Sequence, residues 1–238
     1  MANIFSKVEQ NFLMESGISE MTTLVPYIIT DSVPKLGLMT ALRFLEWVSE
    51  NEEGVISLSS DKSLRNFINS THHFLEHWDE KETKLVLEKY GLDGIKKPNL
   101  SGLQFVQMDE FYPISPKQHN SFFNYVNKNY IEGFGLDPKR GLFINSNDIK
   151  LHQGKSFREV FPDYTIDLSL RYRQATNNME YIQQQSIFLI DDWCSQYDDK
   201  IKLKGDIGFM TTTLGSDGRI AFNISGTSLH SNVALRQT

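Results

Sequence analysis

Apolar residues between positions 32 and 54 recur at the three- and four-residue spacing of a helix that buries one face. They are Leu38, Ala41, Leu42, Leu45 and Val48. Ser32 can cap the first turn, Pro34 suits the start of a helix, and Gly54 can stop it. The pattern therefore predicts an amphipathic helix over residues 32–53.

Short β-prone runs then alternate with helical patterns along the chain. Strands are predicted over residues 55–58, 103–108, 141–144 and 207–210. Helical spacing covers residues 67–75, 79–90, 120–130 and 168–204. This alternation predicts an α/β fold, a three-layer α/β/α sandwich with a mostly parallel, Rossmann-like sheet. We expect one domain over residues 32–238, preceded by an N-terminal extension or edge helix over residues 1–31.

Composition and charge narrow the class of protein. The chain has 238 residues, 39% hydrophobic and 23% charged, which is typical of a globular protein. Its net charge of −6 comes with scattered lysines and arginines, so we expect no nucleic-acid partner. No apolar stretch approaches the ~20 residues that span a bilayer, and the N-terminus lacks the apolar core of a signal peptide. We therefore expect a cytoplasmic protein with no membrane partner.

Cysteine and histidine often bind metals, but their pattern in this sequence predicts no metal site. Cys194 is the only cysteine, which excludes an internal disulfide framework and a cysteine metal cluster, and we interpret it as a helix-packing thiol. His73 and His77 share one helix face beside His72, but a metal site would need a third and a fourth ligand. We interpret the histidines as a solvated or packed cluster and expect no metal cofactor.

Candidate chemistry lies in the loops that follow three predicted strands. Residues 59–63 are rich in hydroxyls and stand before a helix, an arrangement that can hold a phosphate. Asp109 and Glu110 come directly after a strand, where an α/β fold places catalytic carboxylates. In residues 214–223, Gly215 and Gly218 bracket Asp217, which fits either a catalytic loop or a surface turn between two strands.

Two of these stretches resemble a known enzyme family. Residues 107–113 (Gln-Met-Asp-Glu-Phe-Tyr-Pro) and residues 208–223 are similar, in order and spacing, to glucosamine-6-phosphate deaminases (isomerases), whose relatives include 6-phosphogluconolactonases. The similarity runs from about Leu36 onward. It implies opening of a phosphorylated amino-sugar ring, proton transfer between C2 and C1, and release of ammonia to leave fructose 6-phosphate. It also implies a sugar-phosphate ligand, no cofactor, a homo-oligomer, and a sheet that is incomplete at the C-terminus of the chain.

The resemblance assigns roles to individual residues. Asp109 matches the base that removes the C2 proton, Glu110 its usual neighbour, and Asp217 the acid that supports a ring-opening histidine; Arg219 stands in place of that histidine. The remaining positions are implied to contact substrate. Those at the phosphate are Ser60, Lys62 and Ser63, and those at the sugar are Thr212, Thr213 and Asn223.

Four departures from the family pattern predict that the activity is weakened or lost. Arg219 stays protonated and cannot accept the anomeric proton. Ile224 replaces an acid that tunes the missing histidine, Asp61 replaces a glycine of the phosphate loop, and Thr212 and Thr213 replace a glycine pair. One alternative is a pseudoenzyme or regulatory subunit that binds a sugar phosphate without turnover. A second is a 6-phosphogluconolactonase-like hydrolase, although those relatives also use the missing histidine.

Overall fold

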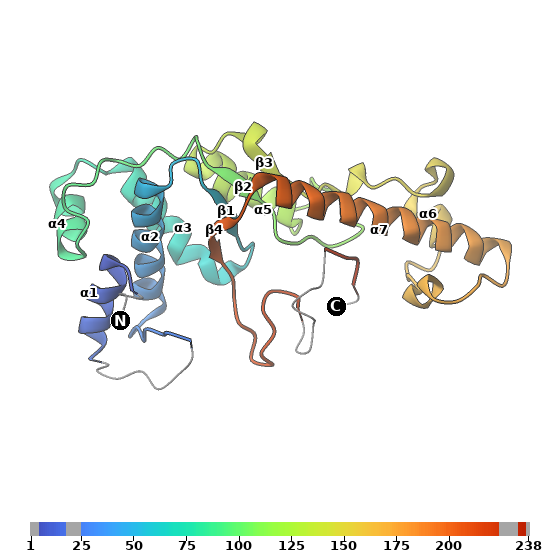
Figure 1. Cartoon of the computed structure of the whole chain (residues 1–238), viewed down its shortest axis with the longest axis horizontal. Helices are drawn as coiled ribbons and strands as arrows, with labels where there is room; N and C mark the ends of the chain where they lie inside the picture. The colour runs from blue at the N-terminus through green and yellow to red at the C-terminus, as the bar shows by residue number, and fades with distance from the viewer. Residues whose placement is uncertain (1–4, 18–24, 224–232, 237–238) are drawn as a thin grey trace. The chain divides into compact units, whose positions relative to one another are not determined.

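The computed structural model describes residues 5–17, 25–223 and 233–236, and these contain a four-stranded sheet (Figure 1). The strands are β1 (Val55–Leu58), β2 (Gln104–Val106), β3 (Gly141–Leu142) and β4 (Ile207–Thr211). Their order is β3-β2-β1-β4, and β1 pairs in parallel with both β2 and β4. This is the order of the first four strands of a classic doubly wound sheet. The predicted α/β fold with a parallel, Rossmann-like sheet is confirmed.

Helices connect the strands. The α-helices are α1 (Lys7–Ser16), α2 (Val33–Glu50), α3 (Arg65–Glu76), α4 (Lys81–Lys89), α5 (Phe122–Val126), α6 (Phe157–Val160) and α7 (Asn178–Lys204). The shorter 3-10 segments are η1 (Lys62–Leu64), η3 (Pro138–Arg140), η4 (Ser146–Asp148), η5 (His152–Gly154) and η6 (Leu168–Arg171), and η2 (Asn127–Glu132) is π-helical. Among the residues described, none of the helices is both long and apolar enough to cross a membrane.

The chain divides into two compact units, and it passes between them several times. Unit 1 holds the described residues up to Phe105 together with Val126–Gly141 and Ile207–Thr213. Unit 2 holds Val106–Tyr125, Leu142–Asp206 and the described residues from Leu214 onward. The chain leaves unit 1 after Phe105, within β2, and again after Gly141, at the start of β3. The residues that follow β2 therefore belong to unit 2, whereas those that follow β1 belong to unit 1.

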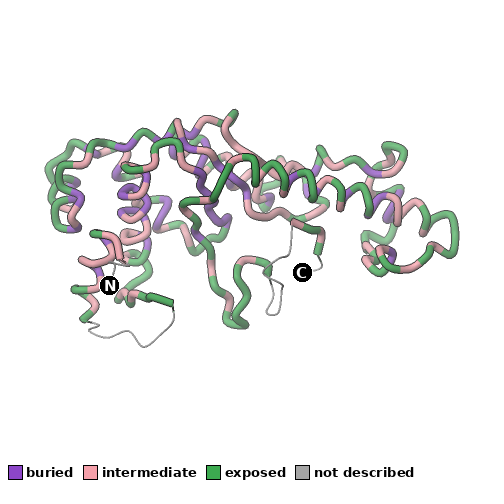
Figure 2. The backbone as a smooth tube through the Cα atoms, in the orientation of Figure 1, coloured by how far each residue is buried: buried purple, intermediate pink, exposed green. Residues whose placement is uncertain are grey.

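The core of unit 1 forms where α2 packs on α3 and β4. The predicted start of α2 is confirmed, because the Ser32 hydroxyl accepts a hydrogen bond from the Lys35 N–H. The ring of Phe44 on α2 lies 5.3 Å from that of Phe209 on β4. In the sheet β1 lies between β2 and β4, and all four of its residues are buried (Figure 2). The short strand is therefore stabilised by burial on both sides rather than by its length.

Residues near the N-terminus also pack within unit 1. The ring of Phe12 in α1 stacks on Tyr90 at 4.3 Å, and the backbone N–H of Lys7 donates to the Glu46 carboxylate at 3.0 Å. Glu46 belongs to α2, so the carboxylate satisfies one of the N–H groups that a helix start leaves unpaired. These contacts attach α1 to α2 and to Tyr90 within unit 1.

The core of unit 2 forms on one face of α7, the long orange helix in Figure 1. Its buried members are Leu151, Val160, Phe161, Leu170, Ile187, Ile190 and Cys194. The last three lie at helical spacing on α7, as the sequence pattern predicts. The packing interpretation of Cys194 agrees with its burial, which raises the pKa of the thiol to about 11.

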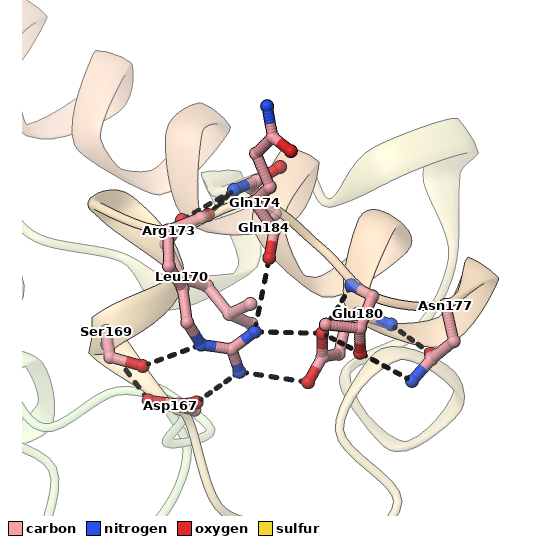
Figure 3. Close-up of polar contacts among 9 residues, drawn as sticks. Asp167, Ser169, Leu170, Arg173, Gln174, Asn177, Glu180 and Gln184 are labelled. Carbon is pink, nitrogen blue, oxygen red and sulfur yellow. Dashed lines mark hydrogen bonds and ion pairs between the residues drawn. The ribbon is translucent and has the colours of Figure 1, made fainter.

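A network of charges breaks the helix that was predicted over residues 168–204. Arg173 donates to the two carboxylate oxygens of Glu180 at 2.9 Å each and to Asp167 at 2.9 Å, as Figure 3 shows. The side chain of Asn177 accepts from the Glu180 N–H at 2.9 Å and caps α7. The Gln184 amide donates to the carbonyl of Leu170 at 2.7 Å. The single long helix was wrong because caps and ion pairs at these positions favour a loop between η6 and α7.

Candidate active site

A cavity of about 380 Å³ lies in unit 2, at the end of β2. Asp109 and Glu110 line it, and Asn223, a third residue of the sequence-predicted site, lines it too. The rest of the wall is mostly apolar and aromatic. It comprises Met108, Phe111, Tyr112, Ile144, Ile149, Ile190, Trp193, Cys194, Asp198, Ala221, Phe222, Val233, Ala234, Leu235 and Arg236. A concave, largely apolar wall with a few polar groups is typical of a small-molecule site.

Asp109 is electrostatically unusual in this cavity. Burial raises the pKa of its carboxyl group from 3.8 to about 6, and the charge of the adjacent Glu110 acts in the same direction. At neutral pH the carboxylate is therefore mostly ionised but more basic than an exposed aspartate. That combination suits a residue that must take up and return a proton.

Glu110 has a different environment, because its carboxylate accepts four hydrogen bonds. They come from the backbone N–H groups of Phe111, Phe122 and Phe123 at 3.0, 3.0 and 2.7 Å, and from the Ser121 hydroxyl at 2.8 Å. Three of these donors lie at the start of α5, where backbone N–H groups lack helical partners. Glu110 therefore fixes the path from the end of β2 into α5 and keeps a negative charge beside Asp109.

Several residues of the cavity wall were absent from the predicted site. Trp193, Cys194 and Asp198 come from α7, and Tyr112 follows the paired acids. Burial raises the pKa of Tyr112 to about 12, so its hydroxyl stays protonated and can donate a hydrogen bond. Cys194 and Asp198 are four residues apart, a spacing that is equally typical of a core face, so the pattern alone did not separate wall from core.

The predicted phosphate residues lie in unit 1, where the loop after β1 leads into η1. Ser60 is 8% exposed, whereas Lys62 and Ser63 are exposed. The Asp61 carboxylate caps the turn by accepting from the Ser63 N–H at 2.7 Å. The Ser63 N–H, a backbone donor that could bind an anion, therefore already donates to the carboxylate of Asp61.

Thr212 and Thr213 follow β4 in the same unit. The Ser59 N–H donates to the Thr211 carbonyl at 3.2 Å, so the loop with Ser60 and the one with Thr212 start from paired strand ends. This edge, at the carboxyl ends of parallel strands, is where α/β sheets bind ligands. Thr212 is exposed and Thr213 half-buried.

Asp217 and Arg219 occupy an exposed turn of unit 2. The Gly215 N–H donates to the Arg219 carbonyl at 2.8 Å, and Gly218 adopts a φ of +80° within the turn. Arg219 Nε lies 3.5 Å from Asp217 Oδ1, with both side chains at least half exposed. Neither residue lines the 380 Å³ cavity. Ile224, which replaces the acid of the family motif, lies outside the described residues.

The three histidines lie on α3 and at its end in unit 1. His72 packs edge-on against Phe134 with ring centroids 5.3 Å apart, and the rings of His73 and His77 are 4.8 Å apart. His77 Nδ1 is 2.7 Å from the Glu80 carboxylate. Throughout the described part of the chain, no three histidine, cysteine or acidic side chains are grouped as a metal ion would require.

Comparison with known proteins shows that this chain is similar in fold to a solved enzyme structure. No protein-family model matches the chain, and no curated protein matches it. A solved structure of a monomeric glucosamine-6-phosphate deaminase, described as a missing link of the NagB superfamily, is similar with a TM-score of 0.53 and 16% sequence identity. The match covers 85% of this chain and 60% of that one. This chain therefore has the fold of that deaminase and spans less than two thirds of its length.

Proposed function

We propose that the protein is an isomerase and deaminase that acts on an amino-sugar phosphate such as glucosamine 6-phosphate. In this reaction Asp109 takes the proton from C2 of the open-chain sugar and returns it to C1. Water then displaces the amine as ammonia and leaves fructose 6-phosphate. Proton transfer next to a carbonyl needs a base near its operating pH and a site that holds the substrate in place, and no redox cofactor.

A single observation carries the proposal: Asp109 lies in a cavity of unit 2, and burial raises its pKa to about 6. A base of that strength remains ionised at neutral pH and gains more from protonation than an ordinary aspartate. Tyr112 adds a protonated hydroxyl to the same wall, and Asn223 adds an amide, both able to bind sugar oxygens. The shared fold with a glucosamine-6-phosphate deaminase supports this chemistry.

Ring opening is the slow part of the proposed reaction. Arg219 cannot act as a base at any physiological pH, and its turn is exposed. The enzyme therefore acts on the small fraction of sugar that is already open in solution, and turnover is low. Below saturation, the overall rate follows the concentration of open-chain sugar, which is the open-chain fraction multiplied by the total sugar concentration.

The test is coupled ammonia release from glucosamine 6-phosphate. Native protein should release ammonia, Asp109→Asn should abolish release, and Asp163→Asn, which changes an exposed aspartate of the same unit, should retain it. Transfer of deuterium from solvent to carbon should depend on Asp109 in the same way. Equal rates in native protein and Asp109→Asn would exclude Asp109 as the base.

A second candidate is binding of a sugar phosphate without turnover. Arg219 favours it, because a guanidinium that stays protonated cannot accept the anomeric proton but can still donate hydrogen bonds to a ligand. Thermal stabilisation by glucosamine 6-phosphate with no ammonia formed would select this candidate. Absence of stabilisation by any hexose phosphate would remove it.

A further inference from the structure

Gln107 connects the end of β2 to the residues that follow it. It is 1% exposed, and its side-chain amide makes two hydrogen bonds to backbone groups. Nε2 donates to the Asp109 carbonyl oxygen at 2.9 Å, and Oε1 accepts from the Ile144 N–H at 3.0 Å. A carbonyl can only accept and an N–H can only donate, so the two partners fix the orientation of the amide.

The backbone of Gln107 is held equally firmly. Its N–H donates to the Leu142 carbonyl at 2.9 Å, and its carbonyl accepts from the Tyr197 hydroxyl at 2.7 Å. The same hydroxyl lies 3.1 Å from the Leu142 carbonyl. Tyr197 is 2% exposed, and burial raises the pKa of its phenol, so the donor stays protonated. All the residues of this arrangement belong to unit 2.

We propose that Gln107 is the positioning residue for Asp109, because its amide ties the Asp109 main chain to the backbone after β3. The inference rests on the proposed function of Asp109 as a base. With the carbonyl of Asp109 fixed, the main chain has little freedom to carry the carboxylate out of the cavity into solvent. Since a displacement of about 1 Å can cost about 100-fold in rate, such a tie affects turnover without touching the substrate.

Two variants separate positioning from a purely structural role. Gln107→Met keeps the length of the side chain and removes both hydrogen bonds. Gln184→Met is its matched control, because the Gln184 amide also donates to two backbone carbonyls of unit 2, those of Leu170 and Arg173, at 2.7 Å each. Both variants should lose stability, since each leaves backbone groups without their partner, and Gln107→Met should lose more because Gln107 is buried and Gln184 is only half-buried.

The decisive readout is the titration of Asp109, followed by carbon NMR of its carboxyl group. In Gln107→Met we expect the pKa to fall by about one unit or more as the carboxylate regains water, and kcat to fall by about 100-fold with little change in KM. In Gln184→Met the pKa and kcat should stay at native values. A native-like Asp109 pKa in folded Gln107→Met would overturn the proposal.

Gln107→Glu gives an independent test that keeps the shape of the side chain. A protonated glutamic acid can still donate to Asp109 and accept from Ile144, whereas an ionised one cannot donate. Burial raises the pKa of such a carboxyl, so turnover should be close to native at acid pH and fall away from native turnover as pH rises. Parallel pH profiles for the two proteins would count against the proposal.

The outcomes for the two claims are distinguishable. If native protein releases no ammonia but the Asp109 pKa still falls in Gln107→Met, the proposed reaction fails and the positioning of Asp109 by Gln107 stands. If native protein is active and neither the Asp109 pKa nor kcat changes in Gln107→Met, the reaction stands and the positioning role fails.

Discussion

Replacing Asp109 by asparagine should stabilise the folded protein while it abolishes activity. The wild-type carboxyl group has a pKa of about 6 in the folded state against an ordinary value of 3.8. Between these values the folded chain holds a proton that the unfolded chain has released. Stability from this group is therefore fully present below about pH 4 and is lost as pH rises through about 6. Asparagine carries no such penalty at any pH.

The size of the effect follows from the shift. About two pKa units at about 1.4 kcal/mol each give an upper value of about 3 kcal/mol above pH 7. Asp109 keeps some contact with solvent, so we expect about 2 kcal/mol in practice. For a chain of this length, that corresponds to a rise in Tm of about 4–8 °C.

Calorimetry at several pH values measures this difference directly. The Tm of Asp109→Asn should exceed that of the native protein above about pH 7, and the gap should close progressively toward about pH 4. Asp163→Asn, at an exposed position, should follow the native curve throughout. A gap between Asp109→Asn and native protein that stays constant with pH would refute a raised pKa for Asp109 and, with it, the basis for its role as the base.

Three further substitutions test other parts of the chain. Arg219→His should leave ammonia release within about twofold of native, because the exposed turn lies outside the wall of the Asp109 cavity. Asp61→Gly should strengthen stabilisation by inorganic phosphate about fivefold in apparent Kd, since it frees the Ser63 N–H and removes a negative charge. Glu180→Gln should lower the Tm at neutral pH, because it weakens the pairing with Arg173. Since the pKa of Glu180 is lowered to about 2, that difference should shrink as pH falls through about 4.5 toward about 2.

Each of these expectations has an outcome that contradicts it. A large gain of ammonia release in Arg219→His would mean that the turn reaches the reacting sugar. Equal phosphate stabilisation in Asp61→Gly and native protein would mean that the loop after β1 binds no anion. A Tm difference for Glu180→Gln that stays unchanged below about pH 2 would show that its carboxylate contributes through packing rather than charge.

The sequence by itself determined the elements that local pattern encodes. The spacing of Leu38 to Val48 predicts α2, and the β-prone run at Val55–Leu58 predicts β1, because period and propensity act within a few residues. The same local information places Asp109 at the end of β2, since the paired acids directly follow a β-prone run. The long helix over residues 168–204 failed at Arg173, where charged partners seven or fewer residues away ended the pattern.

Only the tertiary structure decided which candidate residues have a structural role and which line the cavity. Asp109 and Glu110 are adjacent in sequence, yet the start of α5 binds the carboxylate of Glu110 and burial raises the pKa of Asp109. Likewise, Trp193 and Asp198 lie on α7 beside its core residues and form part of a cavity wall instead. A spacing reports which residues share a face, but only packing determines whether that face meets another side chain, a helix end or an open cavity.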